Sequence, residues 1–251
     1  MTGMLNRLET YYDAVPRSAA RAEEFGPLTL FVREGAGWPY YARPALGYGG
    51  EVSVAEVERV RARQRELGVP EAFEWVAETT PGLRAAVEKS GLVVHEHPLM
   101  VLEGAGATPA PPEGVTVRMV GADDPALPSA AAAPYAAFGV APSPDAAAQL
   151  AARIAAGLTH LAAALDADGT AVSAGQHQPV GQVSEIVGVG TLPTARRRGL
   201  GLAVTAALIA DARARGVETV FLTATDATVA RLYARLGFRT IATALIAEPA
   251  S

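Results

Sequence analysis

The C-terminal half of the chain alternates between two hydrophobic patterns. Residues 183–191 and 217–225 are runs of apolar and β-branched residues, as in buried strands. Residues 200–215 carry apolar side chains at helical spacing, and Arg215 and Gly216 form a helix stop. The pattern predicts further helices at 126–138, 144–156 and 226–236 and strands at 115–120 and 239–247. Residues 158–165 and 170–176 flank a turn-forming cluster and predict a hairpin. The fold class is therefore α/β with a mixed sheet.

The N-terminal half ends in the same order of elements. Ser53 and Glu56 form a capping box before a helix that ends at Gly68. A strand is predicted at 72–78, then a helix with Thr80 as N-cap and Pro81 at its first position, then a strand at 97–103. This repetition indicates an internal duplication. Two unrelated α/β endings are the alternative, because short strand–helix–strand units are common.

A segment rich in proline and glycine divides the halves. Residues 104–114 contain three prolines, three glycines and no large apolar residue, so we expect a linker there. The predicted domains are residues 1–103 and 115–251.

Composition excludes several classes of protein. The 251 residues include no cysteine, which excludes disulfide scaffolds, thiolate metal sites and a cysteine nucleophile. The net charge of −5 argues against binding to nucleic acid. We find neither a signal peptide nor an apolar run long enough for a membrane span, so we expect a cytoplasmic protein. The abundance of alanine and arginine suggests a high-GC bacterial source.

One segment carries most of the candidate chemistry. Residues 191–201 read T-L-P-T-A-R-R-R-G-L-G between a predicted strand and a predicted helix. Glycines allow close approach of a ligand, the helix N-terminus offers unpaired N–H groups, and arginines add positive charge. Together they predict a pyrophosphate-binding loop. A solvated basic turn is the alternative, although three positive charges at a helix N-terminus oppose the helix dipole.

These residues resemble the signature of the Gcn5-related N-acetyltransferases (GNAT family). That signature is a strand, a proline, then Arg/Gln-x-x-Gly-x-Gly/Ala at a helix start, found here as Pro193 and Arg196-x-x-Gly199-x-Gly201. A second family motif, a helix with a tyrosine followed by Gly-Phe, matches Tyr233 and Gly237-Phe238. The resemblance covers about residues 115–247. It implies the acyl-CoA N-acyltransferase fold and, with the duplication, two such units, the first degenerate.

The resemblance also implies a set of cofactor contacts. Backbone groups of the arginine–glycine loop would hold the pyrophosphate of acetyl-CoA, and the end of the preceding strand would pair with its pantetheine arm. Asp226 stands where the family often has asparagine, so that contact loses an amide donor. Its other reading is a helix N-cap. The implied cofactor-binding residues are Val189, Gly190, Thr191, Arg196, Arg197, Arg198, Gly199, Leu200, Gly201 and Asp226.

Two catalytic residues follow from the same resemblance. Tyr233 would protonate the departing CoA thiolate, unless it merely packs on the sheet. Glu185 resembles the position of the family's frequent strand-four glutamate and would be the general base, although a water relay or a different residue would also serve. Alternation along the strand places 185, 187, 189 and 191 on one face. His177 is a second candidate base, although we expect it to be solvated in a polar loop. The spacing of His95, His97 and His160 does not suggest a metal site, and we expect no metal.

The resemblance therefore implies an acetyl-CoA-dependent N-acetyltransferase acting by direct attack in a ternary complex. The alternative is a non-catalytic acyl-CoA-binding regulatory module. We expect a small-molecule amine or a peptide as acceptor, and no nucleic acid or membrane partner. A homodimer is implied only because the family commonly dimerises.

Overall fold

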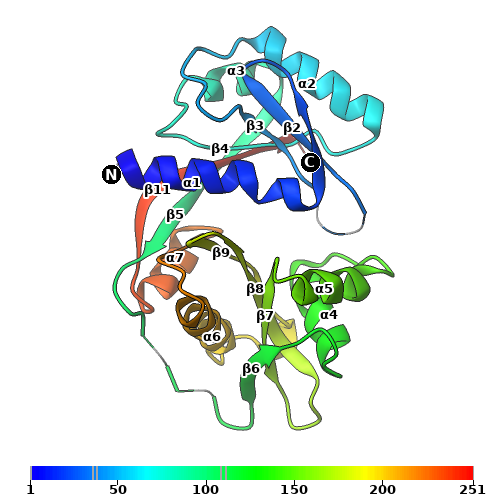
Figure 1. Ribbon diagram of the computed structural model, residues 1–251, viewed down its shortest axis with the longest axis vertical. Helices are drawn as coiled ribbons and strands as arrows, with labels where there is room; N and C mark the ends of the chain where they lie inside the picture. Colours follow the sequence, from blue (N-terminus) through cyan, green and yellow to red (C-terminus); the bar gives the residue numbers. More distant parts are fainter. Residues whose placement is uncertain (1, 36, 38, 108, 111, 251) are drawn as a thin grey trace. The chain divides into compact units, whose positions relative to one another are not determined.

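The computed structural model describes residues 2–35, 37, 39–107, 109–110 and 112–250, and the chain forms two units (Figure 1). Unit 1 comprises Met1–Leu99, Thr223–Ala227 and Thr240–Ser251, and unit 2 comprises Met100–Leu222 and Thr228–Arg239. The sequence predicts one contiguous boundary at 104–114. The units instead alternate along the chain, because strands β5 (Leu92–Leu102) and β11 (Phe238–Pro249) run through both.

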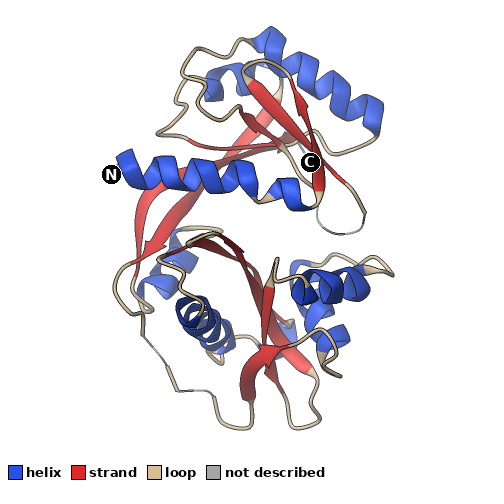
Figure 2. Ribbon diagram, in the orientation of Figure 1, coloured by secondary structure: helices blue, strands red, loops and turns tan. Residues whose placement is uncertain are grey.

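Unit 2 contains the elements that the hydrophobic pattern predicts. They are β6 (Thr116–Val120), α4 (Leu127–Phe138), α5 (Ala146–Ala155), β7 (His160–Leu165), β8 (Ala171–Val180), β9 (Val183–Thr191), α6 (Leu200–Ala214), β10 (Thr219–Thr223) and α7 (Ala227–Ala234). The strand order is β10-β9-β8-β7-β6, antiparallel except for the parallel β9–β10 pair. Helix α6 covers one face of this sheet and α4 the other (Figure 2).

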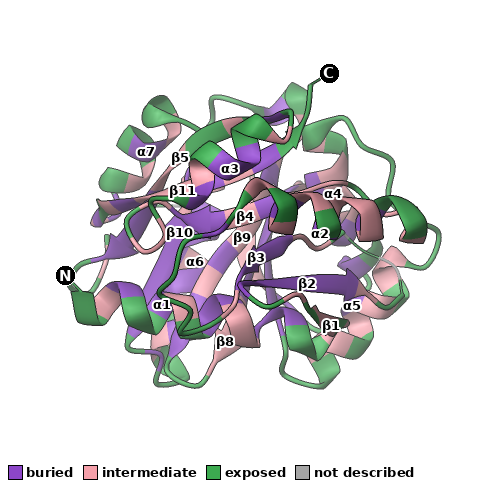
Figure 3. Ribbon diagram, turned by 90° about the horizontal axis from the view of Figure 1, so that it is seen from above, coloured by how far each residue is buried: buried purple, intermediate pink, exposed green. Residues whose placement is uncertain are grey.

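The predicted hairpin forms between β7 and β8. The Asp166 carboxylate closes its turn by accepting hydrogen bonds from the backbone N–H groups of Asp168 (3.1 Å) and Thr170 (2.9 Å). Small side chains dominate the contact with α4, since alanines of α4 pack on Leu161, Ala163 and Ala174. Buried residues lie along β9, β10 and α6 (Figure 3).

Unit 1 contains α1 (Thr2–Ala14), the 3₁₀ turn Pro16–Ser18, β1 (Ala20–Glu24), β2 (Leu28–Arg33), β3 (Ala42–Pro44), α2 (Val54–Leu67), β4 (Phe73–Val76) and α3 (Leu83–Lys89). Its strand order is β1-β2-β3-β4-β11-β5. The elements before residue 53 are not predicted from the sequence. In the apolar core of unit 1, residues of β2, β4, α2 and α3 pack together with Leu245 and Ala247 of β11.

The two units repeat one connectivity. In unit 1, β1–β2 and β2–β3 are antiparallel and β3–β4 is parallel, with α2 between β3 and β4. In unit 2, β7–β8 and β8–β9 are antiparallel and β9–β10 is parallel, with α6 between β9 and β10. This is the order that an internal duplication predicts, and the mixed α/β fold class is confirmed.

Two local predictions differ from the structure. The capping box of α2 is present, with Ser53 and Glu56 bonded reciprocally. Thr80, however, is not the N-cap of α3: the helix begins at Leu83 after Gly82, and the Thr80 carbonyl instead accepts from Leu83 N–H in the preceding turn. Among the described residues, no helix has the length and apolar character that a bilayer crossing requires.

Candidate functional site

The candidate site begins where β9 and β10 part. Their parallel pairing runs only from Val183 opposite Thr219 to Glu185 opposite Phe221, although β9 continues to Thr191. The N–H of Ala224, the residue that follows β10, donates to the carbonyl of Pro98 in β5 and not to β9. The second half of β9 therefore has a backbone edge that β10 does not cover, and an extended ligand can pair with such an edge.

A β-bulge interrupts β9 just where this edge begins. Val187 lies opposite Gln176, but Gly190 lies opposite Ala174, so two residues of β9 face the single residue Gly175. Gly188 takes φ 61°, a conformation that glycine adopts without strain. The bulge shifts the side chains beyond it to the opposite face.

The shared face predicted for residues 185, 187, 189 and 191 is therefore wrong. A Cβ placed on Gly201 of α6 would lie 3.7 Å from Thr191 Oγ1 and 3.8 Å from Val189 Cγ1, so Val189 and Thr191 face α6. Glu185 lies on the other face, in register with Gln178. Glu185 nevertheless stands at the last paired position before β9 and β10 separate.

The loop between β9 and α6 has an unusual backbone. After the 3₁₀ turn Pro193–Ala195, Arg197 takes φ 64° and Gly199 takes φ 78°. Arg197 is the one non-glycine residue with positive φ in the described part of the chain, a conformation that costs about 1 kcal/mol. Alternating backbone conformations of this kind turn successive N–H groups toward one point and form an anion-binding nest.

Helix α6 continues that nest. Its N-cap, Gly199, provides no side-chain hydrogen bond to the first turn. The amides of Leu200 and Gly201 thus stand at the positive end of the helix dipole without a capping side chain. Gly201 also leaves space, because a Cβ there would meet its neighbours only at ordinary contact distances of 3.7 Å or more. The N-terminus fits an anionic group.

The three arginines do not converge as the sequence suggests. Arg196 donates from Nη2 to the Ala137 carbonyl (2.9 Å) and from Nε to the Thr191 carbonyl (3.4 Å). Arg198 donates to the Glu113 carbonyl (3.4 Å). All three side chains are exposed. Two of the three guanidinium groups thus fasten the loop to its surroundings, and the backbone is the better candidate for direct contact with phosphate.

Gly190 has a packing role. A Cβ there would lie 2.7 Å from the Cα of Pro134 and 2.9 Å from the Cβ of Ala137, both on α4. Its carbonyl accepts a hydrogen bond from the buried Ser173 hydroxyl (2.9 Å). Ser173 also bonds to Thr191 Oγ1 (2.9 Å), so it orients the end of β9.

Tyr233 of α7 lies against the first turns of α6. The Thr205 hydroxyl, which donates to the Gly201 carbonyl (2.8 Å), interacts with the Tyr233 phenol. The ring packs edge-on against Phe238, with centroids 6.0 Å apart. Burial raises the pKa of the Tyr233 phenol, and Thr205 opposes this only in part, so the group is protonated at neutral pH.

Two further predictions concern Leu232 and Asp226, at and next to α7. Leu232, expected to share the inward face with Tyr233, is 45% exposed, while Ala230 is buried. Asp226 belongs to unit 1, in the segment Thr223–Ala227, whereas the loop and Tyr233 belong to unit 2. The contact of Asp226 with a cofactor stays a prediction.

The corresponding helix of unit 1 begins differently. Where α6 starts at an uncapped glycine, α2 starts at Ser53, whose hydroxyl accepts from Glu56 N–H, and the Glu56 carboxylate accepts from Ser53 N–H (2.7 Å). The Ser53 N–H and the Ser53 hydroxyl, which donates to the same carboxylate (2.8 Å), lower the pKa of Glu56. The position matching Tyr233 is Val87, which is fully buried. An anionic ligand would thus meet occupied amides and a negative charge in unit 1.

Sequence reasoning missed one group of residues. His177 is not solvated in a loop: it lies on β8, completely buried, with Nδ1 2.9 Å from Ser184 Oγ and Nε2 2.9 Å from Asp211 Oδ2. His160 stacks against it, with ring centroids 4.7 Å apart. Their positions 17 residues apart on two strands, with Asp211 on a helix, give no local motif.

Comparisons with known proteins agree with this geometry. Residues 164–246 match the family model described as FR47-like protein. The fold is similar to a GCN5-related N-acetyltransferase from Kribbella flavida (TM-score 0.75, 26% identity, 98% of this chain and 96% of that one). It is also similar to one from Sphaerobacter thermophilus (TM-score 0.66, 18% identity, 91% and 84%).

A tandem GNAT protein from the clavulanic acid biosynthesis pathway shares the fold as well (TM-score 0.58, 16% identity, 89% of this chain and 79% of that one). No curated protein sequence matches this chain. The resemblance stated from the two motifs is confirmed.

Proposed function

Because residues 164–246 form an FR47-like domain within a fold of the Gcn5-related N-acetyltransferase type, we propose that the protein transfers the acetyl group of acetyl-CoA to a primary amine. The observation that carries this proposal is the nest at Arg197–Gly201: two residues with positive φ leading into a helix that has no capping side chain. Such a nest suits the pyrophosphate of CoA.

In this proposal the backbone holds the substrate. Amides of Arg197, Arg198, Gly199, Leu200 and Gly201 bind the pyrophosphate. The free edge of β9 at Val189 and Thr191 pairs with the pantetheine arm, and a backbone N–H there stabilises the oxyanion of the tetrahedral intermediate. Gly188 and Gly190 shape that edge through the bulge and the close packing of α4.

Two side chains move protons. Glu185, where β9 and β10 separate, accepts the proton of the ammonium group, and the free amine then attacks the thioester carbonyl. The C–S bond breaks, and Tyr233, kept protonated by burial, gives its proton to the CoA thiolate. Solvent afterwards restores both groups to their resting protonation states. No acyl-enzyme is needed in this direct attack.

The acceptor is a small-molecule amine or a peptide. The net charge of −5 favours encounter with a cationic amine, although charge steers association without fixing identity.

Thiol release with a panel of amines, aminated antibiotics and peptides tests the proposal. Because the chain contains no cysteine, free thiol in the assay comes only from CoA. Turnover with at least one amine supports transfer. Binding of acetyl-CoA by calorimetry without turnover would indicate the non-catalytic acyl-CoA-binding module, and absence of binding would exclude both functions.

A pair of variants tests the nest itself. Gly201→Glu introduces a carboxylate in the first turn of α6, where it suits the helix dipole and where a Cβ fits. We expect acetyl-CoA to bind at least about tenfold more weakly than to Gly201→Gln, which has the same size without the charge. Equal affinities of the two variants by calorimetry would contradict binding of phosphate at this turn.

A further inference from the structure

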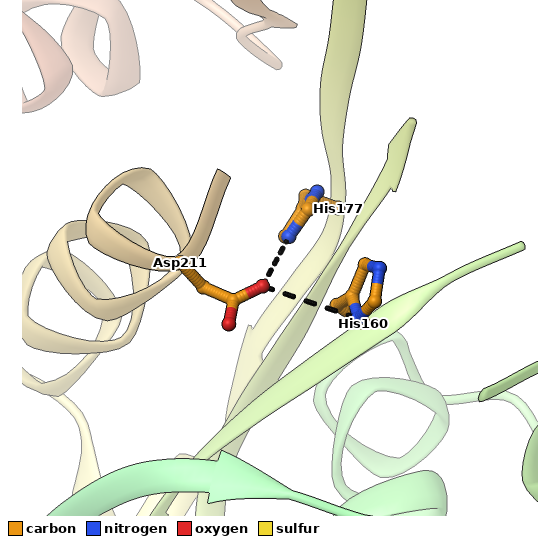
Figure 4. Close-up of side chains that lie close together, drawn as sticks. All are labelled: His160, His177 and Asp211. Atoms are coloured by element: carbon orange, nitrogen blue, oxygen red, sulfur yellow. Dashed lines mark hydrogen bonds and ion pairs between the residues drawn. The ribbon is translucent and has the colours of Figure 1, made fainter. Parts of the chain in front are cut away.

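Two histidines and an aspartate of unit 2 meet on the face of the sheet that α6 covers (Figure 4). His160, the first residue of β7, lies in register with His177 of β8, and Asp211 lies in the last turn of α6. The Asp211 Oδ2 atom is 2.9 Å from His177 Nε2 and 3.9 Å from His160 Nδ1. The proposed acetyl transfer uses none of these residues.

We propose that His160, His177 and Asp211 bind a divalent first-row transition-metal ion such as Zn²⁺. Imidazole nitrogen and carboxylate oxygen are the donors that zinc takes in proteins. One donor atom from each residue lies within 4.8 Å of the others. Ligand atoms around a tetrahedral zinc ion are about 3.4 Å apart, given metal–ligand distances of about 2.1 Å. The two measured distances to Asp211 Oδ2 lie on either side of that value.

The protonation states suit a cation. Burial, with the neighbouring His177 and Arg215, lowers the pKa of His160 to about 4, and burial also lowers the pKa of His177. Both rings are therefore neutral at pH 7, with a lone pair available. Burial opposes ionisation of Asp211, but its hydrogen bonds with Arg215 and His177 lower its pKa, so the carboxylate is charged.

Ser184 can hydrogen-bond to His177 whether or not a metal ion is bound. Without metal, His177 Nε2 carries the proton toward Asp211, and Nδ1 accepts the proton of Ser184 Oγ (2.9 Å). With metal on Nε2, the ring proton moves to Nδ1 and is donated to the same hydroxyl. Serine can act both as donor and as acceptor, so the ring keeps its orientation, as metal-bound histidines require.

His160 has a ring nitrogen available to an ion. Its side chain is 11% exposed, and within the described ranges no group hydrogen-bonds to its ring. A metal ion can therefore bind the ring without displacing a protein hydrogen bond.

One cation already competes for the carboxylate. Arg215 Nε lies 2.6 Å from Asp211 Oδ2, while its Nη2 lies 3.4 Å from Oδ1. The Arg215 side chain is 50% exposed and can withdraw into solvent or shift to Oδ1. Water could then occupy the place of the Arg215 guanidinium and complete the coordination of a bound ion.

The site would be structural. Asp211 lies ten residues after Gly201 in α6, which places it about 15 Å along the helix from the nest at 1.5 Å per residue. The ion would link the β7–β8 hairpin to α6, which packs on the sheet without belonging to its hydrogen-bond network.

Titration of the metal-depleted full chain with Zn²⁺ at pH 7.5 tests the proposal. We expect one ion per chain and a rise in Tm of about 5 °C or more at a hundredfold excess over Kd. His160→Gln should weaken Zn²⁺ binding at least about tenfold. It alters the least buried imidazole of the pair, and circular dichroism checks its fold. His95→Gln is the matched control, since His95 is half-exposed in unit 1 and should leave binding unchanged.

A second variant makes the test independent of ligand removal. Arg215→Gln removes the competing guanidinium and should tighten Zn²⁺ binding several-fold. The proposal is overturned if the wild-type chain binds no stoichiometric Zn²⁺, if His160→Gln binds it as tightly as wild type, or if Arg215→Gln binds it more weakly.

Discussion

At the scale of single residues, the backbone of the loop between β9 and α6, and not its arginine side chains, is the better candidate for binding phosphate. The run Arg196–Arg198 reads as a concentration of positive charge, yet Arg196 and Arg198 donate to backbone carbonyls. The distinctive feature is the positive φ of Arg197, followed by that of Gly199. Strain of this kind persists where the surrounding structure enforces it, and it often lies at functional sites.

Tyr233 provides the clearest single-residue prediction. In Tyr233→Phe the ring can still pack against Phe238, but the proton donor is gone. We expect thiol release to fall about a hundredfold or more, with acetyl-CoA affinity within about threefold of wild type. Tyr48→Phe removes the phenol of an exposed tyrosine in unit 1 and serves as control. Unchanged turnover of Tyr233→Phe would remove it from the mechanism.

At the scale of elements, bulges decide which side chains meet. Strict alternation along β9 places Glu185 beside Val189 and Thr191, and the bulge at Gly188 separates them. In the β7–β8 hairpin, counting from the pair Leu165–Ala171 would place His160 opposite Gln176. The irregularity at Ala164–Leu165 shifts the register so that His160 lies opposite His177. A one-residue shift reverses the face of every later side chain.

Strand β4 places an acidic residue in an unfavourable setting. Burial raises the pKa of Glu74 to about 7, and Arg43 offsets this only in part. Because the folded state holds this proton more tightly than the unfolded state, the contribution of Glu74 to stability is complete below about pH 4.5. It is lost as pH rises through 7.

We therefore expect Glu74→Gln to raise Tm at pH 8 by about 5 °C relative to wild type, and to have little effect at pH 5, where Glu74 is neutral. Thermal unfolding of both proteins at the two pH values checks this. Glu51→Gln, at an exposed carboxylate, should show no such dependence. A Tm difference of the same size at both pH values would exclude titration of Glu74 as its cause.

At the scale of the whole molecule, the C-terminal strand belongs to the core of unit 1. Residues 244–247 of β11 pair antiparallel with β4, and Leu245 is 2% exposed among residues of β2, β4, α2 and α3. The end of the chain thus completes the unit that its beginning starts.

Leu245→Ala should accordingly destabilise unit 1. Removing a buried leucine side chain costs about 2–5 kcal/mol, and we expect faster hydrogen exchange in β4 along with a lower urea midpoint. Thr240→Ala, at an exposed position of the same strand, is the control. If the two variants have equal midpoints, β11 does not contribute to that core as described.

The sequence by itself determined most elements after residue 52 and the resemblance to the Gcn5-related N-acetyltransferases. Hydrophobic periodicity, the capping box at Ser53 and the turn at Asp166 specify helices and strands through interactions between near neighbours. The two motifs, at Arg196–Gly201 and at Tyr233–Phe238, identified the fold, because each lies within one strand–helix unit.

Only the tertiary structure decided which residues meet. Contacts between distant segments set three features of the structure: the register shift at Gly188, the pairing of His160 with His177 and the burial of Leu245 in the core of unit 1. A register is set by packing over a whole sheet face, and one extra residue in a strand changes it. Local sequence patterns do not specify the register of a strand, so the cluster of His160, His177 and Asp211 could be recognised only in the tertiary structure.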